Sequence, residues 1–113
     1  MLESLRRQLW ETIYLNPVTI DELLENKEDE GYKEIDVIEE EHGVTVKLTF
    51  WDDEDLITST YEFNAENFLQ KALIIERQSE TIIFDRNKRI TELLKEIEFV
   101  KNQGMCKVNI LTA

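Results

Sequence analysis

Four consecutive carboxylates, Asp52 to Asp55, are the densest group of side chains in this chain that could do chemistry. Carboxylate oxygens are the ligands that Mg²⁺ and Ca²⁺ prefer, so a divalent-metal site is the first chemistry to consider. A calcium loop of the EF-hand type has ligands at alternating positions, a glycine near its middle and a glutamate at its end. This run has consecutive acids, no glycine and a strand-like segment directly after it. We therefore expect no bound metal and no cofactor.

The other candidate catalytic side chains are one histidine, His42, and one cysteine, Cys106. His42 precedes Gly43 in a predicted turn, and no nucleophile or second metal ligand lies near it in the sequence. Cys106 alternates with Val108 and Ile110, which is typical of a buried strand face, and a lone cysteine cannot form an internal disulfide. Paired carboxylates for glycoside hydrolysis also need a sugar-binding pocket, for which this short chain has little room. We expect no catalytic residue and no enzymatic activity.

The formal net charge of −12 is concentrated in one part of the chain. Residues 21–63 contain sixteen carboxylates and three lysines, whereas residues 1–20 are neutral and residues 64–113 sum to +1. A surface of one sign attracts basic proteins and repels nucleic acid and anionic membranes. The sequence therefore predicts a basic protein partner, no direct nucleic-acid binding and no membrane binding. Surface carboxylates can also serve solubility alone, and the sequence leaves that alternative open.

Two predicted turns carry the densest charge of this acidic segment. Carboxylates held at turns can mimic phosphates and occupy the basic groove of a nuclease or another nucleic-acid-binding protein, with fast, electrostatically steered association. Trp51 lies beside the acids on the polar face of its predicted strand, which is typical of an apolar interface anchor. The predicted partner-binding residues are Glu39, Glu40, Glu41, Trp51, Asp52, Asp53, Glu54 and Asp55.

Two helices are predicted before the acidic segment. The first ends before Pro17, because proline disfavours a helical conformation in the residue that precedes it. The second is expected from Ile20 to about Lys27, since Thr19 can cap it and Glu22 can reach back to the cap. The first helix is amphipathic, and its apolar stripe consists of Leu2, Leu5, Leu9 and Ile13.

An antiparallel β-meander is predicted over about residues 34–63. Apolar and polar residues alternate from Val44 to Trp51, which is the two-residue period of a half-buried strand. After the meander, Asn64 is expected to cap a short helix from Ala65 to about Lys71. Residues 72–84 either form a second hairpin or extend that helix, and their β-branched residues favour the hairpin.

A long amphipathic helix is expected between a capping residue, Asp85, and a stop signal, Gly104. Residues 106–110 alternate again and predict a final strand at the C-terminus. The sequence therefore predicts a single α+β domain, residues 1–113. In this domain we expect the meander to have N-terminal helices and one long C-terminal helix packed on the sheet, with the final strand at the C-terminus.

A small acidic α+β chain without catalytic residues resembles the inhibitors carried by phages and mobile elements, and the immunity proteins that neutralise nuclease toxins. This resemblance is one of composition, and it implies a non-enzymatic protein-binding inhibitor that acts as a nucleic-acid mimic. The lone cysteine and the lack of a long apolar run favour a cytoplasmic location. The alternative is a structural or regulatory subunit that assembles, with itself or with a larger complex, through an apolar surface including Trp10 and Tyr14.

Overall fold

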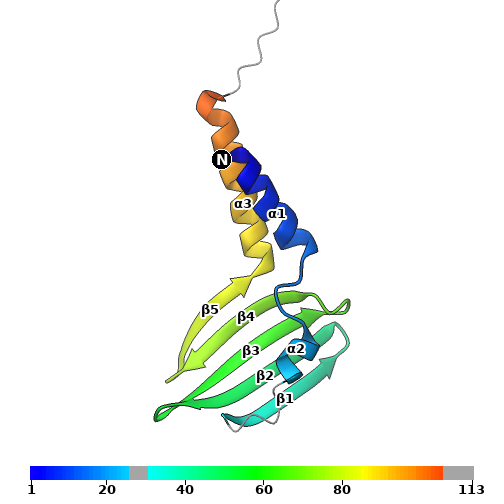
Figure 1. Cartoon of the computed structure of the whole chain (residues 1–113), viewed down its shortest axis with the longest axis vertical. Helices are drawn as coiled ribbons and strands as arrows, with labels where there is room; N and C mark the ends of the chain where they lie inside the picture. Colours follow the sequence, from blue (N-terminus) through cyan, green and yellow to red (C-terminus); the bar gives the residue numbers. More distant parts are fainter. Residues whose placement is uncertain (26–30, 106–113) are drawn as a thin grey trace, which may run out of the picture. The chain divides into compact units, whose positions relative to one another are not determined.

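The main element of the structure is a five-stranded antiparallel sheet whose strands follow one another in sequence order (Figure 1). The structure, a computed structural model, describes residues 1–25 and 31–105. The predicted meander is confirmed, and it continues through the second hairpin rather than a helix. The strands are β1 (Tyr32–Glu40), β2 (Gly43–Asp52), β3 (Asp55–Asn64), β4 (Leu69–Glu76) and β5 (Ser79–Asp85).

Among the described residues, three α-helices flank the sheet in the sequence: α1 (Leu2–Tyr14), α2 (Ile20–Glu25) and α3 (Arg86–Val100), the last continuing as a π-helical turn (Lys101–Met105). The predicted α+β class is confirmed. The predicted cap of α2 is also present, because the Thr19 hydroxyl accepts the N–H of Glu22 at 3.1 Å and donates to its carboxylate at 3.2 Å. The predicted strand at residues 106–110, with Cys106, and the predicted end of the second helix near Lys27 lie outside the described residues.

The chain forms two compact units. A helical unit comprises Met1–Leu15 and the chain from Asn87 onward, and a sheet unit comprises Asn16–Arg86. Leu5 of α1 packs with Leu93 and Ile97 of α3 in the core of the helical unit. The prediction that the whole chain behaves as a single domain stays a prediction.

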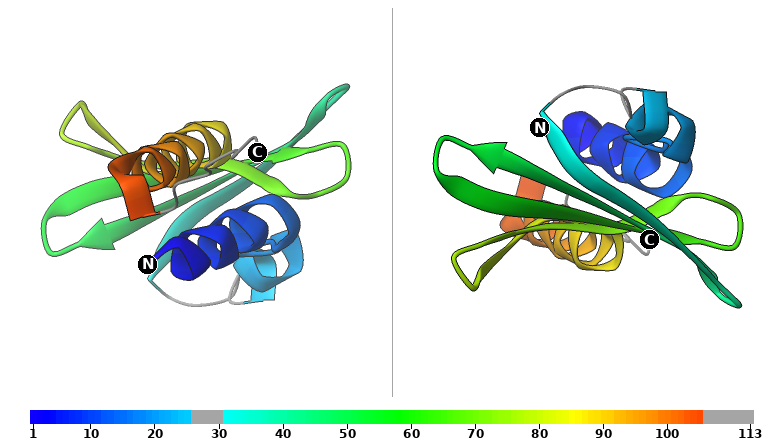
Figure 2. Two further views of the ribbon diagram at one scale, coloured as in Figure 1. Left: turned by 90° about the horizontal axis from the view of Figure 1, so that it is seen from above. Right: turned by 90° about the horizontal axis from the view of Figure 1, so that it is seen from below.

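The core of the sheet unit lies between one face of the sheet and α2, which lies beside that face (Figure 2). Alternate residues of β2 point to the same side, so Val46 and Leu48 are both buried there. Leu23 of α2 belongs to the same buried cluster as Val46 and Leu48. The apolar half of the alternation predicted for residues 44–51 therefore faces α2, and its polar half lies on the second face of the sheet.

The prediction of a short helix after Asn64 is wrong. The Asn64 side-chain oxygen accepts the N–H groups of Glu66 and Phe68, both at 3.0 Å, and Asn67 adopts a positive φ of 65°. The backbone N–H of Asn64 also donates to the carbonyl of Phe68 at 3.0 Å. The side-chain bonds expected of a helix cap therefore close a tight connection, and the chain returns as β4 from Leu69.

Two polar side chains hold the first residue of β4. The Asn16 side-chain oxygen accepts the N–H of Leu69 at 2.9 Å, and Nε of Arg86 donates to the carbonyl of Leu69 at 2.7 Å. The Arg86 guanidinium lies 5.7 Å from the ring centroids of both Phe68 and Phe84. Burial lowers the pKa of Arg86 from its usual value. The buried guanidinium of Arg86 therefore has a structural role, because it holds the start of β4 in place.

Gly43, the first residue of β2, is the position where the sheet tolerates no side chain. Its φ is 154°, and a Cβ there would lie 1.9 Å from the carbonyl oxygen of Phe63 on β3. We predict that Gly43→Ala lowers the free energy of unfolding by at least about 2 kcal/mol, because the backbones of β2 and β3 must separate. Urea denaturation followed by circular dichroism measures this loss.

Glu40→Ala is the matched control, because Glu40 is exposed and pairs directly with Gly43 in the β1–β2 register. It should change the unfolding free energy by no more than about 0.5 kcal/mol. Equal stability of the Gly43→Ala variant and the unmodified protein would contradict the assignment of a close backbone approach.

Candidate functional site

The strand register separates the predicted binding residues into two groups. Glu39–Glu41 lie where β1 turns into β2, and we call this group the β1–β2 acidic turn. Asp52–Asp55 lie where β2 turns into β3, and we call this group the β2–β3 acidic turn. The ten residues of β2 run between the two turns, which places them about 30 Å apart at the usual rise of a strand. The predicted residues therefore form two acidic sites at opposite ends of the sheet.

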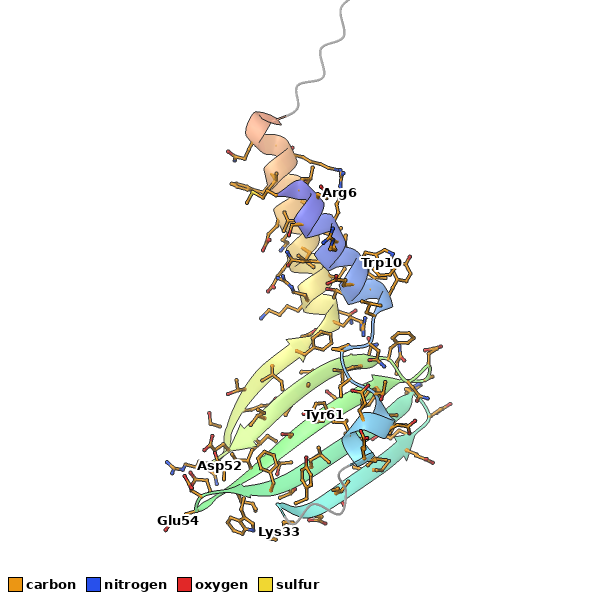
Figure 3. All side chains as sticks on the ribbon, in the orientation of Figure 1. Arg6, Trp10, Lys33, Asp52, Glu54 and Tyr61 are labelled. Atoms are coloured by element: carbon orange, nitrogen blue, oxygen red, sulfur yellow. The ribbon has the colours of Figure 1, made fainter. Side chains whose placement is uncertain are left out.

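The β2–β3 acidic turn is a tight hairpin. Asp52 pairs with Asp55 in the register, Asp53 and Glu54 form the turn, and Asp53 has a positive φ of 55°. Asp52, Asp53 and Glu54 are exposed, whereas Asp55 is partly buried. Figure 3 shows Asp52 and Glu54 at the same end of the sheet as Lys33. The hairpin thus holds three exposed carboxylates within three consecutive residues.

Asp55 has a structural partner, Arg77, in the turn between β4 and β5. Nε and Nη2 of Arg77 donate to the two carboxylate oxygens of Asp55 at 3.0 and 2.9 Å. The hydrogen bonds from Arg77 to Asp55 and the charge of Asp55 raise the pKa of Arg77. This bidentate pair joins two neighbouring turns at one end of the sheet. Asp55 is therefore engaged within the chain, and the available charge of this turn lies on the other three acids.

Trp51 lies on the second face of the sheet, as its sequence position predicts. Its side chain is 54% exposed, and the Lys33 ammonium lies 5.5 Å from the ring centroid, within cation–π range. Leu56 is its direct partner on β3. Tyr32, by contrast, packs edge-on against Phe50, with 6.2 Å between ring centroids. Trp51 is thus an exposed aromatic beside the β2–β3 acidic turn.

The β1–β2 acidic turn has a second explanation within the fold. β1 is an edge strand of the sheet, and its exposed acids include Glu34, Asp36, Glu39 and Glu40. Charged side chains on an edge strand discourage pairing with a strand of another molecule. The β2–β3 acidic turn joins two inner elements of the sheet order, so edge protection does not account for its charge. The β2–β3 acidic turn is therefore the stronger candidate for a binding site.

The net charge follows the two structural units closely. Residues 16–86 contain twenty carboxylates against six lysines and arginines, net −14, and the remaining residues contain five against seven, net +2. Among the described residues, no lysine or arginine forms an ion pair with the exposed acids of either turn. The sheet unit therefore presents a strong negative charge that is not neutralised by ion pairs at these turns.

The described residues contain no group of three or more histidine, cysteine, aspartate and glutamate side chains arranged to hold a metal ion. His42 is exposed in the β1–β2 turn. In the same part of the chain, no helix has the length and apolar character needed to cross a membrane. No family model matches this chain, and no curated protein or solved structure is significantly similar to it. The functional argument therefore depends on the geometry of its own residues.

Sequence reasoning missed the roles of Leu56 and Arg77. Leu56 follows the acidic run as an ordinary strand residue, and only the register places it opposite Trp51. Arg77 lies 22 positions from Asp55, so no local pattern signals their ion pair. The sequence does place Arg77 between two short apolar runs. This position predicts a turn at Arg77, but it does not predict which residue Arg77 contacts.

Because the exposed acids repel one another, we predict that added sodium chloride stabilises this protein. Raising the salt from about 0.01 M to about 0.15 M shortens the screening length from about 30 Å to about 8 Å. Relief of about 1 kcal/mol of repulsion would raise the melting temperature by about 4 °C or more. Differential scanning calorimetry measures this shift.

The triple variant Asp52→Asn, Asp53→Asn, Glu54→Gln is the control for this salt effect. Its melting temperature should respond less to salt, because three of the repelling charges are absent. A melting temperature of the unmodified protein that stays level or falls over the same salt range would contradict a destabilising cluster of like charges.

Proposed function

We propose that this chain is a non-enzymatic protein-binding inhibitor whose acidic sheet binds a basic surface of another protein. The observation that supports it best is the net charge of −14 on the sheet unit, combined with an exposed tryptophan beside three exposed carboxylates. A nuclease or another nucleic-acid-binding protein has a groove of lysine and arginine, because it must neutralise phosphates. Occupying such a groove blocks nucleic acid, as a phage or mobile-element inhibitor or a toxin immunity protein would do.

The hairpin geometry suits this role because it holds the charges in place before binding. Asp52, Asp53 and Glu54 lie on a turn closed by the β2–β3 register, and the Asp55–Arg77 pair braces that turn against its neighbour. Pre-organised charges lose little conformational freedom on binding, and their summed field raises the association rate. Trp51 adds apolar contact area next to the charges.

The test begins with capture of the partner from a cell lysate at low salt and its release by a salt gradient. Association of the captured protein is then followed by surface plasmon resonance. We predict that the variant Asp52→Asn, Asp53→Asn, Glu54→Gln associates about tenfold more slowly at low salt, because electrostatic steering is weakened. The dependence of its association rate on salt should also become shallower.

A matched control removes the same number of charges at the other end of the sheet, with Glu39→Gln, Glu40→Gln and Glu41→Gln. This control should associate nearly as fast as the unmodified protein. If both triple variants slow association equally, the association rate depends on net charge alone, and the β2–β3 acidic turn is not a specific binding site. Unchanged association rates for both variants would contradict the proposed function.

The exposed apolar surface of the helical unit favours a second candidate function, that of a structural or regulatory subunit. Trp10 and Tyr14 of α1 are both more than half exposed, and their ring centroids lie 5.4 Å apart. Phe99 of α3 is 63% exposed and borders an apolar pocket of about 420 Å³ that Leu5 and Val100 also line. Since this unit has a net charge of only +2, charge opposes its self-association far less than that of the sheet unit.

For this second function we predict a homo-oligomer that Trp10→Ser combined with Tyr14→Ser converts to monomers, because the aromatic pair supplies apolar area to the interface. Sedimentation equilibrium in low and high salt measures the mass. Glu11→Ser, an exposed change on the same helix, is the control and should leave the assembly intact. A monomeric unmodified protein under all these conditions would contradict the subunit function.

A further inference from the structure

The face of the sheet away from α2 carries an apolar strip. The register places Trp51 opposite Leu56, and Leu73 opposite Ile82. Ile75 pairs with Thr58, and so lies on the same face. Side chains that are directly opposite in an antiparallel pair point to the same side of a sheet. The alternate residues of the same strands therefore form the core with α2, and these residues form a separate surface.

Four members of this surface are exposed, one from each of four adjacent strands. We call this set the apolar strip; it consists of Trp51 on β2, Leu56 on β3, Ile75 on β4 and Ile82 on β5, which are 54%, 39%, 37% and 48% exposed. Leu73 is buried between them. With strands about 4.8 Å apart and a rise of about 3.4 Å per residue, the strip runs diagonally for about 20 Å. Exposed apolar residues that adjoin one another and are rimmed by polar residues are common at interaction sites.

Negative charge borders the strip. On the same face, Glu34 and Asp36 lie on the β1 side, Glu80 lies on β5, and the β2–β3 acidic turn adjoins Trp51. Counted by register, this face carries six carboxylates against two lysines, Lys47 and Lys71, and a third lysine, Lys33, lies over Trp51. An occupant must therefore be apolar where it contacts the strip and basic on its flanks. Nucleic acid, an anionic membrane and a second copy of this face are all repelled.

The position of the strip also restricts the backbone of its occupant. β2, β3 and β4 each pair with a neighbour on both sides, so an extended peptide lying on this face finds no free backbone partners in these strands. Buried N–H and C=O groups without partners are costly. An α-helix satisfies its own backbone groups, and about 14 residues of helix span about 20 Å. A helix packed on a sheet face is also the arrangement that α2 adopts on the other side.

We propose that the apolar strip is the docking site for a basic amphipathic helix of the partner protein. The helix places one apolar face on Trp51, Leu56, Ile75 and Ile82 and sets its lysines and arginines over the bordering carboxylates. This inference rests on the proposed function, which it deepens by naming the part of the partner that is bound. Electrostatic attraction raises the association rate of the partner, and burial of the apolar strip slows its dissociation.

The probe is a synthetic peptide of about 18 residues with leucine at helical spacing and lysine elsewhere, long enough to cover the strip. Binding is followed by the fluorescence of Trp51 in a Trp10→Phe background and by the gain of helical circular dichroism. The expected result is saturable binding with helix formation. A peptide of the same composition with scrambled order should bind at least about tenfold more weakly, a difference of about 1.4 kcal/mol. Equal binding of the two peptides would overturn the proposal in favour of charge alone.

The variant Ile75→Ser with Ile82→Ser removes half of the strip without changing charge. It should weaken peptide binding about tenfold or more through faster dissociation, with an unchanged association rate. Val37→Ser, an exposed apolar change on the face that carries α2, is the matched control and should have no such effect. Leu56→Ser serves as a second variant if the double variant unfolds. Unweakened binding by a folded strip variant would overturn the proposal.

Binding of the variants to the captured partner distinguishes failure of this inference from failure of the proposed function. If strip variants bind it normally while Asp52→Asn, Asp53→Asn, Glu54→Gln slows association, the inference is wrong and the proposed function stands. If neither set of variants changes binding to it, both are wrong. A dimer of the unmodified protein that the strip variants abolish would identify a second copy as the occupant, and would likewise overturn the proposal.

Discussion

The pairing of β2 with both of its neighbours is the constraint on which the rest of the sheet unit depends. β2 pairs with β1 on one side and with β3 on the other, from Gly43 to its C-terminal residues. This pairing assigns Val46 and Leu48 to the core and Trp51 to the opposite face. The two acidic turns lie at opposite ends of the sheet for the same reason, because each adjoins one end of β2. A slip of one residue would bury the polar half of β2 and expose its apolar half.

The acidic residues divide into groups with different physical roles. Those on β1 border an exposed edge, where charge prevents pairing between molecules. Asp55 is neutralised by Arg77 and braces two turns. Asp52, Asp53 and Glu54 have neither explanation, and they lie beside an exposed aromatic residue. Composition alone treats all of these carboxylates as one surface, whereas the fold isolates a small group whose charge is explained neither by edge protection nor by an ion pair.

Local signals predicted the structure well where the deciding interaction is local. The cap at Thr19 was correct, because its hydroxyl bonds to Glu22, only three residues away. The same kind of signal failed at Asn64, whose side-chain oxygen accepts two nearby N–H groups in a helix cap and in a tight loop alike. Residues 69–76 decide between the helix cap and the tight loop, because their pairing with β3 and β5 holds them in the sheet. Long-range pairing overrode the local preference.

The sequence by itself determined the class of the fold, the starts of α2 and α3, the alternation along β2 and the position of the charge. Each of these depends on residues a few positions apart, within reach of one helical turn or one pleat. The tertiary structure alone decided that Trp51, Leu56, Ile75 and Ile82 share a face and that Arg77 meets Asp55. These neighbours come from separate strands, and the continuous register of β2–β3, β3–β4 and β4–β5 in this part of the sheet brings them together. Such contacts depend on which strands pair and in what register, which no local pattern specifies.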